Sequence, residues 1–321
     1  MRLCRYSREG RVSIGLYCDE FVIPLAAALR VVNETELAKQ AEQSNDLIDW
    51  LPPIGNHWNR LKLAHSFLQP VIDQAKYADE DASFRLNVRD IELLPPIALP
   101  RKLLLLAGNY VEHVKEQGDL SAEREQTFPY VFSKPPSTTM IGSRACFKIP
   151  ECSPSKIDYE LELAIIIGQR CSQVTAEEGL RAIAGYSVIN DISDRGFRPN
   201  PNRTERPRDK FFDWLHGKWH DGSCPCGPCV TTSDDISNPN RLAMKLSIDG
   251  EIRQNSNTDQ MVFAVGEVIA FISRFVTLEP GDILSTGTPA GVGNATGRFL
   301  QPGQKVQAWI EKIGTLDTTI V

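Results

Sequence analysis

The sequence predicts an α+β protein, mostly β, with a small α/β N-terminal domain before a larger strand-rich domain. Two observations support this fold class. Short apolar–polar alternations bounded by turn residues recur along the chain, and they dominate from residue 101 onward. The segment Leu93–Pro100, LLPPIALP, is typical of a Pro-rich connector. We therefore expect one domain over residues 1–100, connector included, and a second over residues 101–321.

Composition excludes several classes of protein. The chain has 321 residues, 41% of them hydrophobic and 24% charged, which is ordinary for a globular protein. The formal net charge is −6 and no long Lys/Arg run occurs, so nucleic acid is not an expected partner. No apolar stretch is long enough to cross a bilayer, and no apolar signal-peptide region follows MRLCRYSREG. We expect a cytoplasmic protein without membrane association, whose eight cysteines are reduced.

The N-terminal domain is expected to begin with short strands and to continue with helices. Residues 2–24 alternate around the turn-like REG and CDE segments. Helical patterns follow over residues 34–51 and 59–78, and Pro70 is expected to interrupt the second.

The second domain mixes strands with a few helices and one long polar, Pro-rich loop, Arg195–Trp214. A hairpin is expected at LAMKLSIDGEIRQNS, with Asp249 and Gly250 in the turn. Thr175 and Glu178 have the spacing of a helical capping box. The strands are expected at KLLLLAGNY, YVFSKPPS, DYELELAIIIG, YSVINDIS and GDILSTGTPAGVG, and the other helices at YVEHVKEQG and MVFAVGEVIAFISRFV.

The strand KIDYELELAIIIG carries two glutamates on one face. Residues two apart on a strand project the same way, so Glu160 and Glu162 can hold one ion between them. Asp191 ends the apolar strand YSVIND and is a candidate third ligand. Hard carboxylate oxygens suit Mg²⁺, Mn²⁺ or Ca²⁺. A solvated strand face, with Asp191 starting a turn, is the alternative.

A second candidate group is the pair His113 and Glu116 in NYVEHVKE. Residues at i and i+3 on a helix face each other, and a carboxylate can orient an imidazole that activates water. An ordinary surface pair is the alternative. The CPCGPC segment, with His216 and His220 nearby, is an incomplete zinc ligand set, so partly buried free thiols beside a Pro/Gly turn are the favoured interpretation.

Two further segments could bind an anionic substrate. Lys218 lies in HGKWHDG among aromatic residues, where it could provide a cation or an acid. Gly287 and Thr288 lie in the Gly-rich turn STGTPAGVG, whose backbone N–H groups could hold a carboxylate. A surface lysine and a structural turn are the corresponding alternatives.

Together these segments resemble the fumarylacetoacetate hydrolase superfamily, over nearly all of residues 101–321. The matching segments occur in the family's order: GNYVEH, KPPS, DYELELAIIIG, GYSVINDIS, GKWHDG, LEPGDILSTGTPAGVG and PGQKVQAWIEKIGTL. The first hundred residues are similar to the small N-terminal domain of bacterial-type members. The resemblance implies a mixed β-sandwich roll and a homodimer.

The resemblance also implies roles for individual residues. Mg²⁺ or Mn²⁺, with Ca²⁺ possible in crystals, would be held by Glu160, Glu162 and Asp191. The family's water-activating pair maps to His113 and Glu116, and its pocket lysine maps to Lys218. Its carboxylate-binding threonine, in a glycine turn, maps to Thr288 with Gly287. Two recurring pocket or structural positions map to Lys134 and Arg195.

The sequence departs from the family pattern beside the expected pocket. Asp194 and Gly196 replace an alanine and an aspartate, and Arg198 stands at a glutamine position. His220 occupies a place that is often phenylalanine. Arg198 would favour a more anionic substrate.

The resulting hypothesis is a metal-dependent hydrolase that cleaves a carbon–carbon bond in a 1,3-diketo acid such as an acylpyruvate. The ion would stabilise the leaving enolate, His113 would activate water, and Lys218 and Thr288 would bind the substrate. Decarboxylation of a 2-oxo diacid, keto–enol isomerisation, and hydration or dehydration remain alternatives within the superfamily. A non-catalytic binding or scaffold protein is the alternative of another class.

Overall fold

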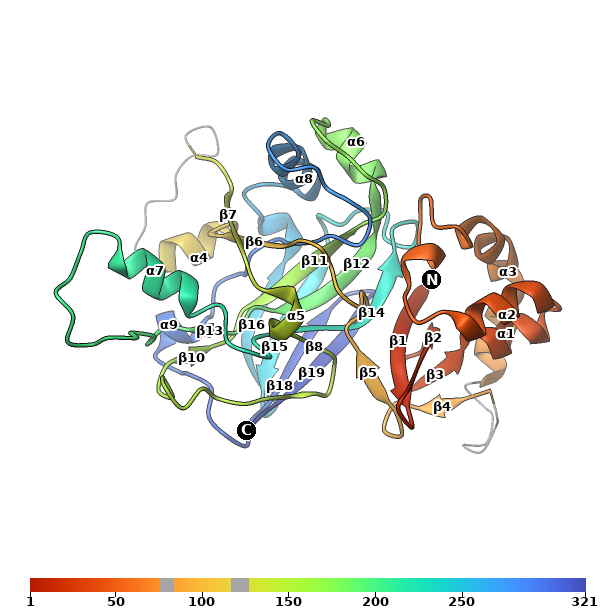
Figure 1. Cartoon of the computed structure of the whole chain (residues 1–321), viewed down its shortest axis with the longest axis horizontal. Coiled ribbons are helices and arrows are strands. Elements are labelled where there is room, and N and C mark those ends of the chain that lie inside the picture. The colour runs from red at the N-terminus through yellow and green to blue at the C-terminus, as the bar shows by residue number, and fades with distance from the viewer. Residues whose placement is uncertain (76–83, 117–126) are drawn as a thin grey trace.

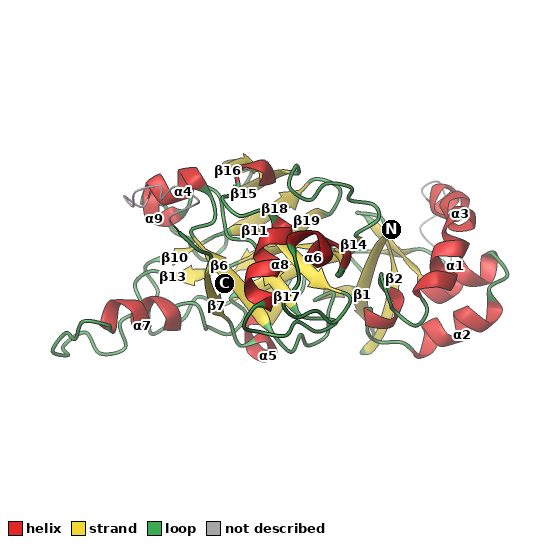
Figure 2. Ribbon diagram, turned by 90° about the horizontal axis from the view of Figure 1, so that it is seen from above, coloured by secondary structure: helices red, strands yellow, loops and turns green. Residues whose placement is uncertain are grey.

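The computed structural model describes residues 1–75, 84–116 and 127–321. Figure 1 shows a strand-rich centre with helices at its two ends. Helices α1 (Leu25–Val31), α2 (Thr35–Gln43) and α3 (Trp58–Ala75) lie at one end, and α7 (Asp209–His216) lies at the other, as the view from above also shows (Figure 2).

Twelve strands of the described residues form one large sheet. Its main path runs through β4 (Leu86–Asn87), β3 (Phe21–Pro24), β2 (Arg11–Tyr17), β1 (Arg2–Arg8), β14 (Cys224–Thr232), β12 (Ile183–Asn190), β11 (Leu161–Ile167), β17 (Ile283–Ser285), β6 (Leu103–Ala107) and β7 (Tyr130–Ser133). Off this path, β5 (Glu92–Leu94) pairs with β1 and β8 (Met140–Ile141) pairs with β14. The antiparallel β1–β14 pairing joins the N-terminal strands to those of residues 101–321.

A second sheet has the order β16 (Glu251–Asn257), β15 (Ala243–Ile248), β18 (Lys305–Ile310), β19 (Gly314–Ile320) and β9 (Cys146–Phe147). The β15–β16 hairpin was expected, and Asp249 and Gly250 at its turn have positive φ angles of 51° and 83°. Such angles match the twist of a tight hairpin. A separate ribbon pairs β10 (Ile157–Asp158) with β13 (Ser193–Asp194).

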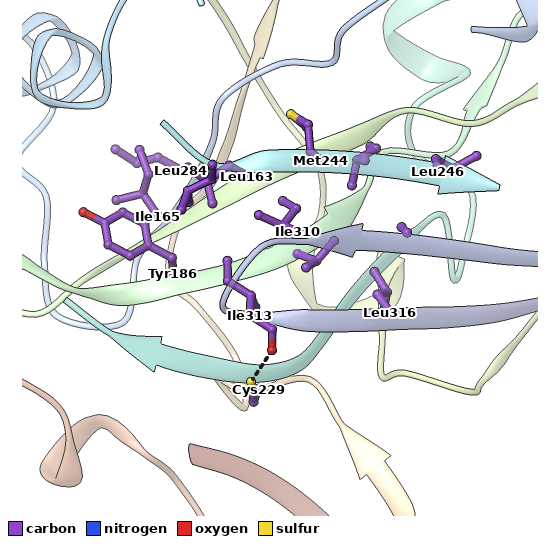
Figure 3. Close-up of a cluster of buried hydrophobic side chains, with 14 of the residues drawn as sticks. Leu163, Ile165, Tyr186, Cys229, Met244, Leu246, Leu284, Ile310, Ile313 and Leu316 are labelled. Atoms are coloured by element: carbon purple, nitrogen blue, oxygen red, sulfur yellow. Dashed lines mark hydrogen bonds between the residues drawn. The ribbon is translucent and has the colours of Figure 1, made fainter. Parts of the chain in front are cut away.

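Successive side chains of β11 point alternately into two hydrophobic clusters, one on each face of the strand. Leu163 and Ile165 point into the cluster that the second sheet closes with Met244, Leu246 and Ile310 (Figure 3). Ala164 and Ile166 belong to the opposite cluster, which includes buried side chains of the N-terminal helices. Both faces of the strand are therefore covered, which explains its continuous apolar run. The prediction of a mostly β, mixed sandwich is confirmed.

The remaining helices are short. The capping box predicted for Thr175 and Glu178 is present at the start of α6 (Ala176–Arg181). The helix expected within residues 261–276 is α8 (Val265–Ser273). The others are α4 (Val111–Glu116), α5 (Pro136–Thr139), α9 (Gly293–Thr296) and the 3₁₀ turns η1 (Ile48–Trp50) and η3 (Thr258–Gln260). No helix among the described residues is long and apolar enough to cross a membrane.

Three predictions of local structure were wrong. Helix α3 continues through Pro70, which lies on an exposed face of the helix. The pattern over residues 34–51 is broken because Ser44 is extended and its hydroxyl accepts a hydrogen bond from the Trp50 indole. The polar loop that begins at Arg195 contains the start of α7, where the Asp209 carboxylate accepts the Arg206 backbone N–H at 3.0 Å.

The CPCGPC segment is the start of strand β14 rather than a turn, and its thiols are fully buried rather than partly so. Cys224 and Cys226 pack in one hydrophobic cluster and Cys229 in the other, so the three do not converge on one ion. Figure 3 shows the Cys229 thiol donating to the Ile313 carbonyl at 3.3 Å.

We expect thiol reagents to modify native protein first at the two exposed cysteines, Cys146 and Cys152. Burial raises the pKa of Cys226 and of Cys229 to about 12, which suppresses the reactive thiolate. Labelling before and after denaturation, with a Cys146→Ser/Cys152→Ser double variant as control, measures the difference. Rapid labelling of β14 in that variant would show that the sheet opens readily.

Candidate active site

Antiparallel pairing of β11 with β12 brings three carboxylates together. Leu161 is opposite Asn190, and the Asp191 N–H donates to the Glu160 carbonyl at 2.8 Å. Asp191 therefore lies beside Glu160, and Glu162 follows on the same face of β11. One oxygen from each of the three lies within 4.8 Å of the others, and all three residues are buried.

Neighbouring strands hold these carboxylates in place. The Ser285 hydroxyl donates to Glu162 Oε2 at 2.5 Å and the Gly287 N–H donates to the same oxygen at 3.0 Å. Gly287 has a φ of 83°, and a Cβ there would lie 3.1 Å from the Leu106 carbonyl oxygen, so glycine suits the position. Lys134 Nζ donates to Asp191 Oδ1 at 2.7 Å and also to two backbone carbonyls.

Two further cations bridge the carboxylates. Lys218 Nζ donates to Glu160 Oε2 at 2.9 Å and to Asp191 Oδ2 at 2.5 Å. Its ammonium lies 5.0 Å from the Phe132 ring and 5.8 Å from the Trp214 ring, within cation–π range. Arg195 Nη2 pairs with Glu160 Oε1, and its Nε donates to Asp158 Oδ2 at 3.0 Å.

The surroundings move the carboxylate pKa values in opposite directions. Burial raises the pKa of Glu160, but Arg195, Lys218 and His113 outweigh it and lower the value to about 2. Burial, with the charges of Asp191 and Glu160, raises the pKa of Glu162 well above its usual range. Glu162 is thus the carboxylate whose charge is least compensated by the protein's own cations.

The carboxylate cluster suits a divalent cation. Its donors are hard oxygens from three side chains, the set that Mg²⁺ and Mn²⁺ accept in proteins. Burial, and then the like charges of Asp191 and Glu160, raise the pKa of Glu162, so its carboxylate lacks a full counter-charge from the protein. A bound ion would supply that charge.

A small cavity adjoins the cluster. The volume available in it to the centres of water molecules is about 50 Å³. Its polar and aromatic lining comes from His113, Glu160, Arg195, Trp214, Lys218 and Thr288. Lys218 and Arg195 turn cationic groups toward it, and the Thr288 hydroxyl accepts the Gln254 amide at 2.9 Å.

Of the other predicted site residues, some lie at the cavity and others do not. His113 is 4% exposed and comes from α4, whereas the side chain of Glu116 lies outside the described part of the chain. Lys134 uses its donors on Asp191 and backbone carbonyls rather than on the cavity. Arg198 is exposed, pairs with Glu205 at 2.9 Å and does not line the cavity.

Sequence reasoning missed several residues that shape the site. Asp158 anchors Arg195 and accepts the backbone N–H groups of Tyr159, Gly293 and Asn294. Asp158 precedes Glu160 by two residues on the charged face of its strand, and this spacing was the available signal. The contacts of Ser285, Phe132 and Trp214 depend on tertiary packing, and no local pattern marks them.

Residues 102–321 match the family model described as the fumarylacetoacetate (FAA) hydrolase C-terminal domain. The chain belongs to the fumarylacetoacetate hydrolase family. A mitochondrial oxaloacetate tautomerase of Xenopus laevis is 36% identical over 263 residues, which cover 81% of this chain and 77% of that protein. The family model begins close to the predicted domain boundary.

Two solved structures extend the likeness to three dimensions. A fumarylacetoacetate hydrolase from Exiguobacterium antarcticum superposes with a TM-score of 0.73 at 27% identity, covering 100% of this chain and 99% of that one. A fumarylpyruvate hydrolase from Pseudomonas aeruginosa, in complex with Mn²⁺ and pyruvate, has a TM-score of 0.60 at 29% identity, covering 72% and 91%. The family thus includes hydrolases and a tautomerase, and one relative binds Mn²⁺ with a 2-oxo acid.

Proposed function

We propose that this protein is a Mg²⁺- or Mn²⁺-dependent enzyme that interconverts the keto and enol forms of a small 2-oxo diacid such as oxaloacetate. The observation that carries the proposal is the small cavity in which His113 and two cations face the carboxylate cluster. The likeness to an oxaloacetate tautomerase supports the same reaction class.

The size of the cavity favours a short substrate. A volume of about 50 Å³ for water centres corresponds to roughly three to five water molecules. That space can hold a short substrate such as a four-carbon diacid. The two cations in its lining suit an anionic substrate, with Arg195 beside a carboxylate and Lys218 beside the 2-oxo oxygen.

The chain's own residues can move the proton. His113 would accept a proton from the carbon beside the 2-oxo group, as this C–H bond breaks, and return it to the enolate oxygen. Lys218 would stabilise that oxygen while it is charged, and Arg195 and Thr288 would orient a carboxylate. A divalent ion held by Glu160, Glu162 and Asp191 would add Lewis-acid polarisation of the 2-oxo group.

Carbon–carbon hydrolysis of an acylpyruvate is the second candidate. The hydrolase structures that superpose on this chain favour it. It needs the same enolate stabilisation, with His113 deprotonating water instead of carbon. The homodimer implied by the family resemblance remains a prediction for either reaction.

We expect purified protein with Mn²⁺ to make oxaloacetate reach its keto–enol equilibrium faster. The reaction is monitored through the decrease in the absorbance of the enol form. Pyruvate release from acylpyruvates is measured in parallel. Chelator should abolish both signals. Turnover of acylpyruvates alone would favour hydrolysis, and no turnover of either substrate by metal-loaded protein would favour the non-catalytic alternative.

A further inference from the structure

A buried carboxylate and a histidine form a pair just outside the cavity. Asp194 Oδ2 lies 3.0 Å from His220 Nε2, and the Asp194 side chain is fully buried. Asp194 Oδ1 accepts the Ser153 hydroxyl at 2.8 Å and the Gly196 N–H at 2.9 Å. An ionised carboxylate can only accept hydrogen bonds, so His220 donates from Nε2. The His220 ring also packs edge-on against Phe197, with 5.4 Å between the centroids.

This pair ties together the two segments that supply the cavity's cations. Asp194 immediately precedes Arg195, and His220 follows Lys218 by two residues. A backbone bond joins the same segments, since the Asp194 N–H donates to the Gly217 carbonyl at 2.9 Å. Gly217 packs so closely there that a Cβ would lie 2.4 Å from the Asp194 carbonyl oxygen. The link therefore has a backbone contact and a side-chain contact.

Neither Asp194 nor His220 lines the cavity, so their influence on a substrate must pass through Arg195 and Lys218. Both cations already contact Glu160, one on each carboxylate oxygen. The Glu160 carboxylate thus fixes the distance between the two cationic groups. The Asp194–His220 link fixes the distance between the backbone segments that carry them. Charged groups act on a transition state only when they are held in the productive geometry.

We propose that Asp194 and His220 are positioning residues that set the relative placement of Arg195 and Lys218 and so the turnover of a dianionic 2-oxo acid. The proposal rests on the proposed function for its substrate class.

The test compares His220→Phe, which keeps a ring but removes the donor, with His220→Gln, whose amide can still donate to Asp194. His216→Phe is the matched control, because His216 contacts the rings of Phe212 and Trp219 rather than Asp194. We expect His220→Phe to lower kcat on the diacid about 10- to 100-fold, the range of a small misplacement of reacting groups. Mn²⁺ affinity should stay within about twofold, and His220→Gln should recover most of the activity.

A parental kcat in His220→Phe, while the wild type is active, overturns the positioning role and leaves the proposed function standing. Loss of Mn²⁺ affinity in step with kcat also overturns it, since the pair would then act on the metal ligands. If the wild type turns over neither substrate, the proposed function fails and a crystal structure of His220→Phe decides instead. Displacement of the Arg195 and Lys218 side chains supports the link, and unchanged positions overturn it.

Discussion

Replacing Glu162 with alanine is expected to abolish Mn²⁺ binding and turnover while the protein still folds. Glu162 is one of three carboxylates on one side of the β11–β12 pair, and burial together with Asp191 and Glu160 raises its pKa. Removing this side chain takes away one ligand and relieves repulsion between like charges. The variant leaves the Ser285 hydroxyl and the Gly287 N–H without their carboxylate partner, so a modest loss of stability offsets part of that relief.

The measurements are metal content after dialysis and thermal unfolding with and without Mn²⁺. Wild-type protein should gain about 2.7 kcal/mol of unfolding free energy at Mn²⁺ concentrations 100-fold above Kd, whereas Glu162→Ala should gain nothing. Glu162→Gln separates charge from shape, and Glu177→Ala, at an exposed position on α6, is the control for an arbitrary lost glutamate. Stoichiometric Mn²⁺ in Glu162→Ala would remove Glu162 from the metal site.

The charge balance of the cluster explains why a divalent ion and an anionic substrate belong together. Four buried carboxylates, Asp158, Glu160, Glu162 and Asp191, face two buried lysines, Lys134 and Lys218, and the partly buried Arg195. With these seven groups ionised and His113 neutral, as a base must be, the cluster is one charge negative. Burial, and then the nearby charges of Asp191 and Glu160, raise the pKa of Glu162. A divalent ion would leave it one charge positive. A substrate carboxylate or an enolate oxygen would then be the natural counter-charge.

The metal cluster could be predicted from sequence because it depends on regular structure. Alternation on β11 places Glu160 and Glu162 together, and an antiparallel neighbour ending at Asn190 brings Asp191 beside them. The hairpin at Asp249 and Gly250 was predictable for a similar reason, since its turn geometry is local.

The cavity wall could not be predicted in the same way. Arg195 and Arg198 lie three residues apart in one polar segment, yet Arg195 turns inward onto Asp158 whereas Arg198 pairs with Glu205 at the surface. The β10–β13 ribbon decides this, because it places Asp158 opposite Ser193 and beside the start of the segment. Pro70 shows the same limit, since α3 continues through a residue that usually ends a helix, and no local pattern marks the exception.

His113→Ala is expected to separate proton transfer from enolate stabilisation. His113 is buried in the cavity lining and is among the groups that lower the pKa of Glu160, so the imidazole lies close to the carboxylate cluster. Tautomerisation and hydrolysis both need a base, either at carbon or at water, and should lose roughly 10²- to 10⁴-fold in kcat. Decarboxylation of the same 2-oxo diacid needs mainly enolate stabilisation, so any such activity should survive better.

Steady-state kinetics of His113→Ala and Glu162→Ala on oxaloacetate and on an acylpyruvate provide the comparison. Glu162→Ala should remove all three activities, because each depends on the divalent ion. His113→Ala should keep its Mn²⁺ affinity, since His113 is not among the three clustered carboxylates. His113→Gln is the matched control for polarity, because it keeps hydrogen-bonding groups but cannot take up a proton near neutral pH.

If His113→Ala works at the parental rate on both substrates, His113 is not the base. The proton must then pass through another group of the cavity, and Lys218, the other titratable donor in its lining, would be the next residue to replace.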